Sequence, residues 1–188
     1  DLWIGETFSY LGEALLFVER AKSTGLPVMV TMSFEQPVAR SYEGDTPADC
    51  ARRLGDAGAD IVGVNCLNGP EQQLPIALEM RSAVGGFVAA QPVAYRTSAE
   101  QPDFTSTPSF PYALDPLQLS RQEMAEYALA AQQGGIDYIG SCCGSIQAHV
   151  RAMGKAIGKT PVAERAWKNT AGRAMSAYEY YEHTETEV

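Results

Sequence analysis

The sequence predicts a parallel α/β fold, and three observations carry this prediction. Five short runs rich in Val, Ile and Gly alternate with longer segments of helical periodicity. The runs are apolar at consecutive positions, as in strands that are buried on both faces of a parallel sheet. Three helix-to-strand junctions share one pattern, in which a glycine closes the helix and an apolar run follows at once.

Five strands are too few to close an eight-stranded barrel, which takes about 250 residues. Two architectures therefore remain: an open doubly wound sheet, or about the last five βα units of a (β/α)8 TIM-barrel fold. A strand-like run already starts at residue 2, which favours the second architecture. We expect a partial barrel whose first three units precede this chain.

The strands and the first helix are placed by periodicity. The predicted strands are residues 2–7, 27–33, 60–66, 87–92 and 137–142. The first helix, residues 11–23, carries apolar side chains at positions 11, 14, 15, 18 and 21, which form one stripe along a helix. Gly25 follows this helix as a C-terminal stop.

The later helices are placed mainly by their ends. Thr46 is suited to cap the second helix, with Pro47 in its first position and Gly58 at its end. The next helices are expected at residues 70–83, 120–133 and 148–157. Ser120 and Glu123 have the spacing of a capping box, which marks the start of the fourth helix.

Two segments fall outside this alternation. Residues 94–119 form a long loop that is rich in proline and aromatic residues, and a structureless loop of this length in a compact domain usually serves as a lid or a binding loop. Residues 159–188 are aromatic and charged, and we expect a C-terminal extension that forms a terminal helix or an oligomer contact. The barrel domain is therefore expected to comprise residues 1–158.

The composition limits the class of protein. The hydrophobic content of 45% is sufficient for a buried core. A net charge of -9 without a basic cluster argues against nucleic acids and anionic membranes as partners. Four cysteines are too few for a disulfide scaffold in a chain of 188 residues, so the thiols indicate a reducing compartment and a cytoplasmic protein.

Three of the four cysteines lie where predicted strands end. Cys66 closes one apolar run, and Cys142 and Cys143 close another. Because the carboxyl ends of parallel strands share one face, these three thiols are expected to meet there. Three thiolates that leave one coordination position open are typical of a catalytic zinc site.

The residues by themselves leave other interpretations open. Cys66 and Cys143 are also compatible with small buried side chains in a core. The adjacent pair Cys142 and Cys143 is compatible with a redox pair. Cys50 lies within a predicted helix and is expected in the core, and His149 is expected to be solvated or to pack against its helix, because a fourth ligand would close the site.

The motifs around these cysteines resemble those of a known family. Residues 63–66 (Gly-Val-Asn-Cys) and 140–144 (Gly-Ser-Cys-Cys-Gly) are similar to the paired zinc motifs of the homocysteine S-methyltransferases. Residues 90–95 (Ala-Gln-Pro-Val-Ala-Tyr) and 110–116 (Phe-Pro-Tyr-Ala-Leu-Asp-Pro) resemble the betaine–homocysteine methyltransferase branch. Two positions depart from the pattern: Ser141 replaces a glycine, and Thr7 replaces the tyrosine of the betaine branch.

The resemblance implies a fold, a metal and a substrate. It implies a (β/α)8 barrel in which Cys66, Cys142 and Cys143 hold a zinc ion beside homocysteine. Glu6 would bind the amino group of homocysteine. Asn65, next to a metal ligand, is expected either to face the substrate or to cap the following turn.

The resemblance also implies methyl transfer to homocysteine, giving methionine. The donor would be betaine or a related onium compound; the alternatives are S-methylmethionine and methyltetrahydrofolate. Without the first three barrel units the chain alone is expected to be inactive, so an alternative of another class is an inactive fragment or a non-catalytic zinc-binding module. We expect no partner beyond these small molecules, apart from a second copy of the chain in a homo-oligomer.

Overall fold

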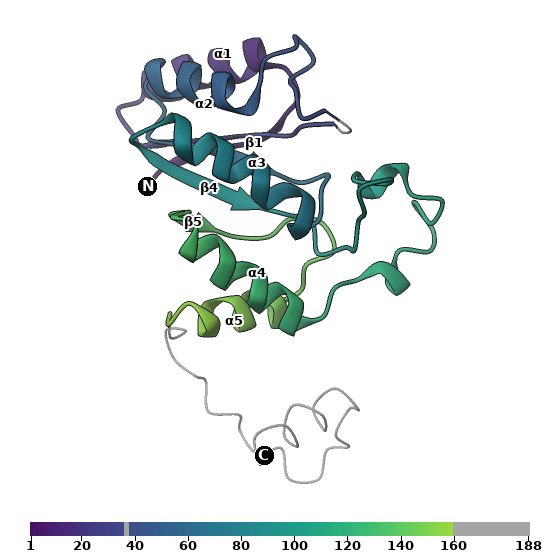
Figure 1. Cartoon of the computed structure of the whole chain (residues 1–188). Coiled ribbons are helices and arrows are strands. Elements are labelled where there is room, and N and C mark those ends of the chain that lie inside the picture. Colours follow the sequence, from purple (N-terminus) through teal and green to yellow (C-terminus); the bar gives the residue numbers. More distant parts are fainter. Residues whose placement is uncertain (36–37, 160–188) are drawn as a thin grey trace.

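A computed structural model describes residues 1–35 and 38–159, and these residues form five strands that each lead into a helix (Figure 1). The strands are β1 (Trp3–Phe8), β2 (Val28–Met32), β3 (Ile61–Asn65), β4 (Phe87–Gln91) and β5 (Tyr138–Ile139). The helices are α1 (Leu11–Lys22), α2 (Pro47–Asp56), α3 (Pro70–Ala83), α4 (Arg121–Gln133) and α5 (Gln147–Ala156). The predicted elements are thus present in the predicted order.

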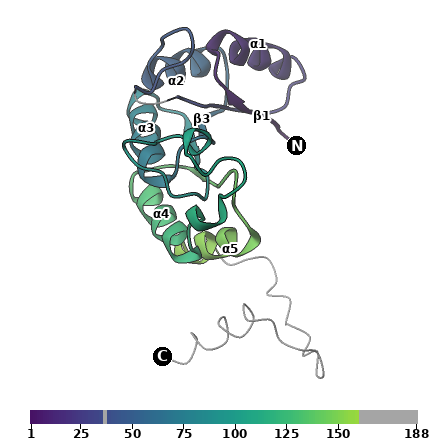
Figure 2. The ribbon, with the colours of Figure 1, turned by 90° about the vertical axis from the view of Figure 1, so that its right-hand side faces the viewer.

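The five strands form one parallel sheet in the order β1-β2-β3-β4-β5. Figure 2 shows the helices following one another along the outside of an arc, with the strands on its inner side. In a doubly wound sheet the strand order reverses at a switch point, whereas here each strand pairs with the next one along the chain. The partial barrel is therefore confirmed, and the open doubly wound sheet is excluded.

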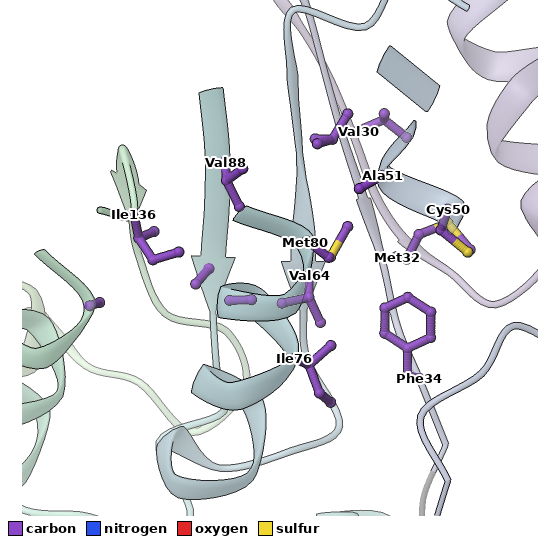
Figure 3. Close-up of a cluster of buried hydrophobic side chains, with 14 of the residues drawn as sticks. Val30, Met32, Phe34, Cys50, Ala51, Val64, Ile76, Met80, Val88 and Ile136 are labelled. Atoms are coloured by element: carbon purple, nitrogen blue, oxygen red, sulfur yellow. The ribbon is translucent and has the colours of Figure 1, made fainter. Parts of the chain in front are cut away.

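The core lies between the sheet and its helices. Figure 3 shows that side chains of β2, β3 and β4, such as Val30, Val64 and Val88, meet Ile76 and Met80 of α3. Cys50 of α2 is fully buried in the same cluster, as predicted. Desolvation raises the pKa of Cys50 to about 12, so this cysteine is an inert thiol of the core.

The helix ends follow the signals in the sequence. The Thr46 side chain accepts a hydrogen bond from the Asp49 N–H at 3.1 Å, and Pro47 occupies the first position of α2. Ser120 and Glu123 form a reciprocal capping box at the start of α4. Helix α2 ends at Asp56, two residues before the predicted Gly58, because Gly58 has a φ of +100° and cannot continue a right-handed helix.

Two segments differ from the prediction. Strand β5 contains two residues where six were predicted, because Pro92 follows the partner strand β4 and has no N–H to continue the ladder. Residues 94–119 are more ordered than a structureless loop, since they contain two 3-10 turns, Phe104–Ser106 and Asp115–Leu117.

The prediction for residues 159–188 lies outside the described residues, apart from Lys159 itself. Among the helices of the described part, none is long and apolar enough to cross a membrane.

The start of α1 is held by a carboxylate from the loop before α2. Glu43 accepts hydrogen bonds from the N–H groups of Leu11 at 2.6 Å and Gly12 at 2.8 Å. Desolvation alone would raise the pKa of Glu43, but these backbone hydrogen bonds outweigh it and the pKa is lowered. The ionised carboxylate therefore satisfies two N–H groups that α1 leaves unpaired.

We expect Glu43→Gln to lower the free energy of unfolding at pH 7 by about 0.5–1 kcal/mol, because the charged acceptor of two N–H groups is lost. The effect is small because the carboxylate is exposed and screened by water. Since the pKa of Glu43 is lowered by folding, the contribution is present above its unfolded pKa and is lost as the pH falls through its folded pKa. Urea unfolding at pH 7 and at pH 3 measures both effects. Glu19→Gln, within α1, is the matched control, and an equal loss in both variants would contradict the capping role.

Candidate metal centre

Three thiols meet at the carboxyl ends of the strands. Cys66 follows β3, and Cys142 and Cys143 lie in the loop after β5. The Sγ atoms of Cys66 and Cys143 are 3.5 Å apart, those of Cys142 and Cys143 are 4.0 Å apart, and all three atoms lie within 4.8 Å of one another. All three cysteines are free thiols. Two distant segments thus bring their sulfur atoms into one group.

The spacing of the sulfur atoms fits a zinc ion. Thiolates bind zinc at about 2.3 Å, so a tetrahedral arrangement holds its sulfur atoms about 3.8 Å apart. The group is also graded in exposure, from buried Cys66 through half-buried Cys142 to exposed Cys143. One side of the group therefore faces solvent, as a site that accepts a small molecule requires.

Cys66 is held in an uncommon backbone conformation. Its φ is 62° and that of Leu67 is 57°, and residues other than glycine rarely adopt such positive values. The N–H of Cys66 donates to the carbonyl of Gln91 at 3.0 Å, and its carbonyl accepts from the Gln73 side chain at 2.9 Å. These contacts stabilise the sharp turn after β3 that directs Cys66 toward the cysteine pair.

The cysteine pair is held by the end of β4. The Cys142 N–H donates to the Pro92 carbonyl at 2.7 Å, and the Ala94 N–H donates to the Cys143 carbonyl at 2.8 Å. The hydroxyl of Ser141 donates to the same Pro92 carbonyl at 3.1 Å. Gly144 has a φ of +76°, and a Cβ there would lie 2.5 Å from the Tyr95 ring, so only glycine fits.

The charge of the thiol group is concentrated on one sulfur. The pKa of Cys142 is lowered to about 6, mainly by a hydrogen bond from Cys66 and further by the thiol of Cys143 and the Asn65 amide. The hydrogen bond to Cys142 and burial raise the pKa of Cys66, and burial raises the pKa of Cys143. Three thiolates so close together repel one another, so full ionisation of the group needs a cation to balance them.

Asn65 connects the thiol group to the neighbouring strands. Its Oδ1 accepts hydrogen bonds from the Thr7 N–H at 2.8 Å and the Thr31 hydroxyl at 2.7 Å. Its Nδ2 donates to the Thr7 hydroxyl at 2.7 Å and lies 3.8 Å from the Cys142 sulfur. Asn65 is fully buried, and both ends of its amide are engaged within the protein. A direct contact between Asn65 and a substrate stays a prediction.

Glu6 lies on β1 at the same end of the sheet, and its side chain is exposed. Gln91 Nε2 donates a hydrogen bond to Glu6 Oε1 at 2.9 Å. Gln91 is a functional residue that the sequence signals only weakly, as a polar residue that ends an apolar strand within the 90–95 motif. Gln73, which is fully buried in α3 behind Cys66, carries no such signal in the sequence.

Aromatic side chains of the 94–119 loop pack beside the thiols. The rings of Tyr95 and Phe104 stack with centroids 5.3 Å apart, and Phe110 contacts Phe104 edge-on. Phe104 is buried in one cluster with Cys66. These rings attach the loop to the thiol group.

His149 is buried, and its Nδ1 accepts from the Ile146 N–H, which confirms a helix-packing role for His149.

This chain is similar in sequence to known methyltransferases. The family model described as homocysteine S-methyltransferase matches residues 1–157. Betaine–homocysteine S-methyltransferase 1 of Danio rerio is 40% identical over 163 residues, covering 84% of this chain and 40% of that protein. S-methylmethionine–homocysteine S-methyltransferase BHMT2 of Pongo abelii is 36% identical over 167 residues, covering 84% of this chain and 44% of that protein.

A solved structure supports the fold. The apo form of the homocysteine methyltransferase MmuM from Escherichia coli superimposes with a TM-score of 0.60 at 16% sequence identity, covering 83% of this chain and 49% of that one. The chain spans about 40% of the length of the first curated relatives that it matches. On the family match over residues 1–157 and the identities of 36–40%, this chain belongs to the homocysteine S-methyltransferase family.

Proposed function

We propose that this chain forms the zinc- and homocysteine-binding part of a methyltransferase that converts homocysteine to methionine. The observation that carries the proposal is the group of three cysteine sulfur atoms within 4.8 Å of one another. Cys66, Cys142 and Cys143 would hold the zinc ion. When bound, zinc lowers the pKa of a thiol at its remaining coordination position and so supplies the thiolate that attacks.

The residues of the chain would contribute binding and charge. The exposed carboxylate of Glu6 would bind the ammonium group of homocysteine by a charge-assisted hydrogen bond. Three cysteine thiolates carry more negative charge than one zinc ion neutralises, which would keep the substrate sulfur electron-rich. Asn65 would hold Cys142 in position through its Nδ2 group.

Betaine is the donor that we propose, because betaine-dependent relatives reach 40% identity. The homocysteine sulfur would form a bond to the methyl carbon, while the C–N bond breaks and both of its electrons stay on nitrogen, giving dimethylglycine. The half-buried ring of Tyr95, which stacks on buried Phe104 beside the thiols, would be the aromatic group that attracts such an onium group. S-methylmethionine is the second candidate donor, because a relative whose name gives S-methylmethionine as its donor is 36% identical.

The test combines metal analysis with binding and turnover. We expect one zinc ion per chain and zinc-dependent binding of homocysteine, measured by mass spectrometry and calorimetry. Methionine formation is then followed with betaine and with S-methylmethionine. Absence of zinc from the folded protein would contradict the proposal. Zinc that admits no thiol would favour the non-catalytic zinc-binding module, and homocysteine binding without turnover would favour the inactive fragment.

A further inference from the structure

Gln91 makes a contact that crosses the inner face of the sheet. It lies on β4, whereas its partner Glu6 lies on β1, and β2 and β3 stand between them. Adjacent strands are about 4.8 Å apart, so a flat sheet would separate these two strands by roughly 14 Å. The side chains nevertheless meet at 2.9 Å, because the sheet curls as Figure 2 shows.

The surroundings of Gln91 leave room for this contact. A Cβ at Gly140, after β5, would lie 2.9 Å from Gln91 Cγ, so the glycine provides the space in which the Gln91 side chain lies. The main-chain carbonyl of Gln91 meanwhile accepts the hydrogen bond from the Cys66 N–H. Gln91 thus contacts both the carboxylate of Glu6, which is proposed to bind the amino group of homocysteine, and the backbone of Cys66, a proposed metal ligand.

The Gln91 amide is only half used within the protein. Gln91 is 8% exposed, and its Oε1 is buried without a hydrogen-bond partner among the residues that the structure describes. A buried acceptor without a partner destabilises a folded protein, whereas methionine would fill a similar volume without this penalty. Packing alone therefore does not account for a glutamine at this position.

We infer that Gln91 is a positioning residue for the amino acid substrate. Its Nε2 orients the Glu6 carboxylate toward the ammonium group of that substrate. This inference rests on the proposed function, because it concerns the amino group of homocysteine. Glu6 is exposed, so its carboxylate is the acceptor that the ammonium group reaches, and Gln91 acts through Glu6.

The test compares two thiols that differ only in the amino group. L-Homocysteine and 4-mercaptobutyrate are titrated into the zinc-loaded protein and its Gln91→Met variant. We expect Gln91→Met to weaken homocysteine binding about tenfold, with the affinity for 4-mercaptobutyrate unchanged. The melting temperature is expected to stay equal or rise. Gln122→Met, which removes an exposed Gln122–Glu126 hydrogen bond on α4, is the matched control and should change neither affinity.

A second variant perturbs the same contact without removing it. Gly140→Ala would press a methyl group against Gln91 Cγ, and it is expected to cause the same selective loss for homocysteine. Equal weakening of both thiols by either variant would overturn the role of Gln91 while leaving the proposed function intact. If the wild-type protein with zinc bound neither thiol, the proposed function would fail and this inference with it.

Discussion

Replacing Cys142 with serine is expected to abolish stoichiometric zinc binding. Its sulfur has the lowest pKa of the three thiols, about 6, and lies within 4.8 Å of both others. A serine hydroxyl stays protonated at neutral pH and is a poor zinc ligand, so only two thiolates would remain. Removal of an outer hydrogen-bond partner of a metal ligand typically lowers metal affinity about 10–100-fold, and we expect a larger loss of zinc affinity here.

Zinc content after dialysis against a weak chelator measures this effect. Cys50→Ala is the matched control, because Cys50 is equally a cysteine but lies in the core between α2 and the sheet. That control should lose stability and keep one zinc ion per chain. Retention of zinc at wild-type affinity by Cys142→Ser would refute the three-thiolate site.

Asn65→Ala is expected to cause the largest loss of stability among the polar residues near the site. It removes a fully buried amide that bonds to Thr7 and Thr31 and leaves their N–H and hydroxyl groups unpaired. Unpaired buried groups and the resulting cavity together cost about 2–4 kcal/mol in the free energy of unfolding. Zinc affinity should also fall about 10–100-fold, because Cys142 loses a neighbouring donor.

Denaturant unfolding of the zinc-free protein and zinc titration separate these two effects. Asn68→Ala is a suitable control, since Asn68 is equally buried but donates one side-chain hydrogen bond, to the Pro102 carbonyl. Its stability loss should be smaller. An Asn65→Ala protein within about 0.5 kcal/mol of the wild type would mean that the network around Asn65 does not hold the strand ends together.

Much of the fold follows from local signals. The Thr46 cap and the Ser120–Glu123 capping box act between residues three positions apart, so their sequence is enough to place the helix starts. Strand β5 was predicted too long, because its length depends on its partner strand. Pro92, about 50 residues earlier in the chain, ends the ladder that would have continued it.

The meeting of the three thiols was predictable from the sequence, and the contacts that support them were not. Cys66 and the cysteine pair stand out because each closes an apolar run, and the carboxyl ends of parallel strands share one face. Gln91 was missed, since its contact with Glu6 joins residues 85 positions apart. The left-handed conformations of Thr7, Cys66 and Leu67 were missed as well, because none of these residue types favours a positive φ.

The sequence by itself determined the order of strands and helices, the boundaries of most helices, and the three thiols available to a metal. These depend on periodicity, caps and residue chemistry, which act over a few positions. Only the tertiary structure decided how far the sheet curls, and with it that Cys66 and Cys143 come within 3.5 Å across 77 positions of chain. Such distances result from the summed twist of five strands and the packing of their helices, which no local pattern records.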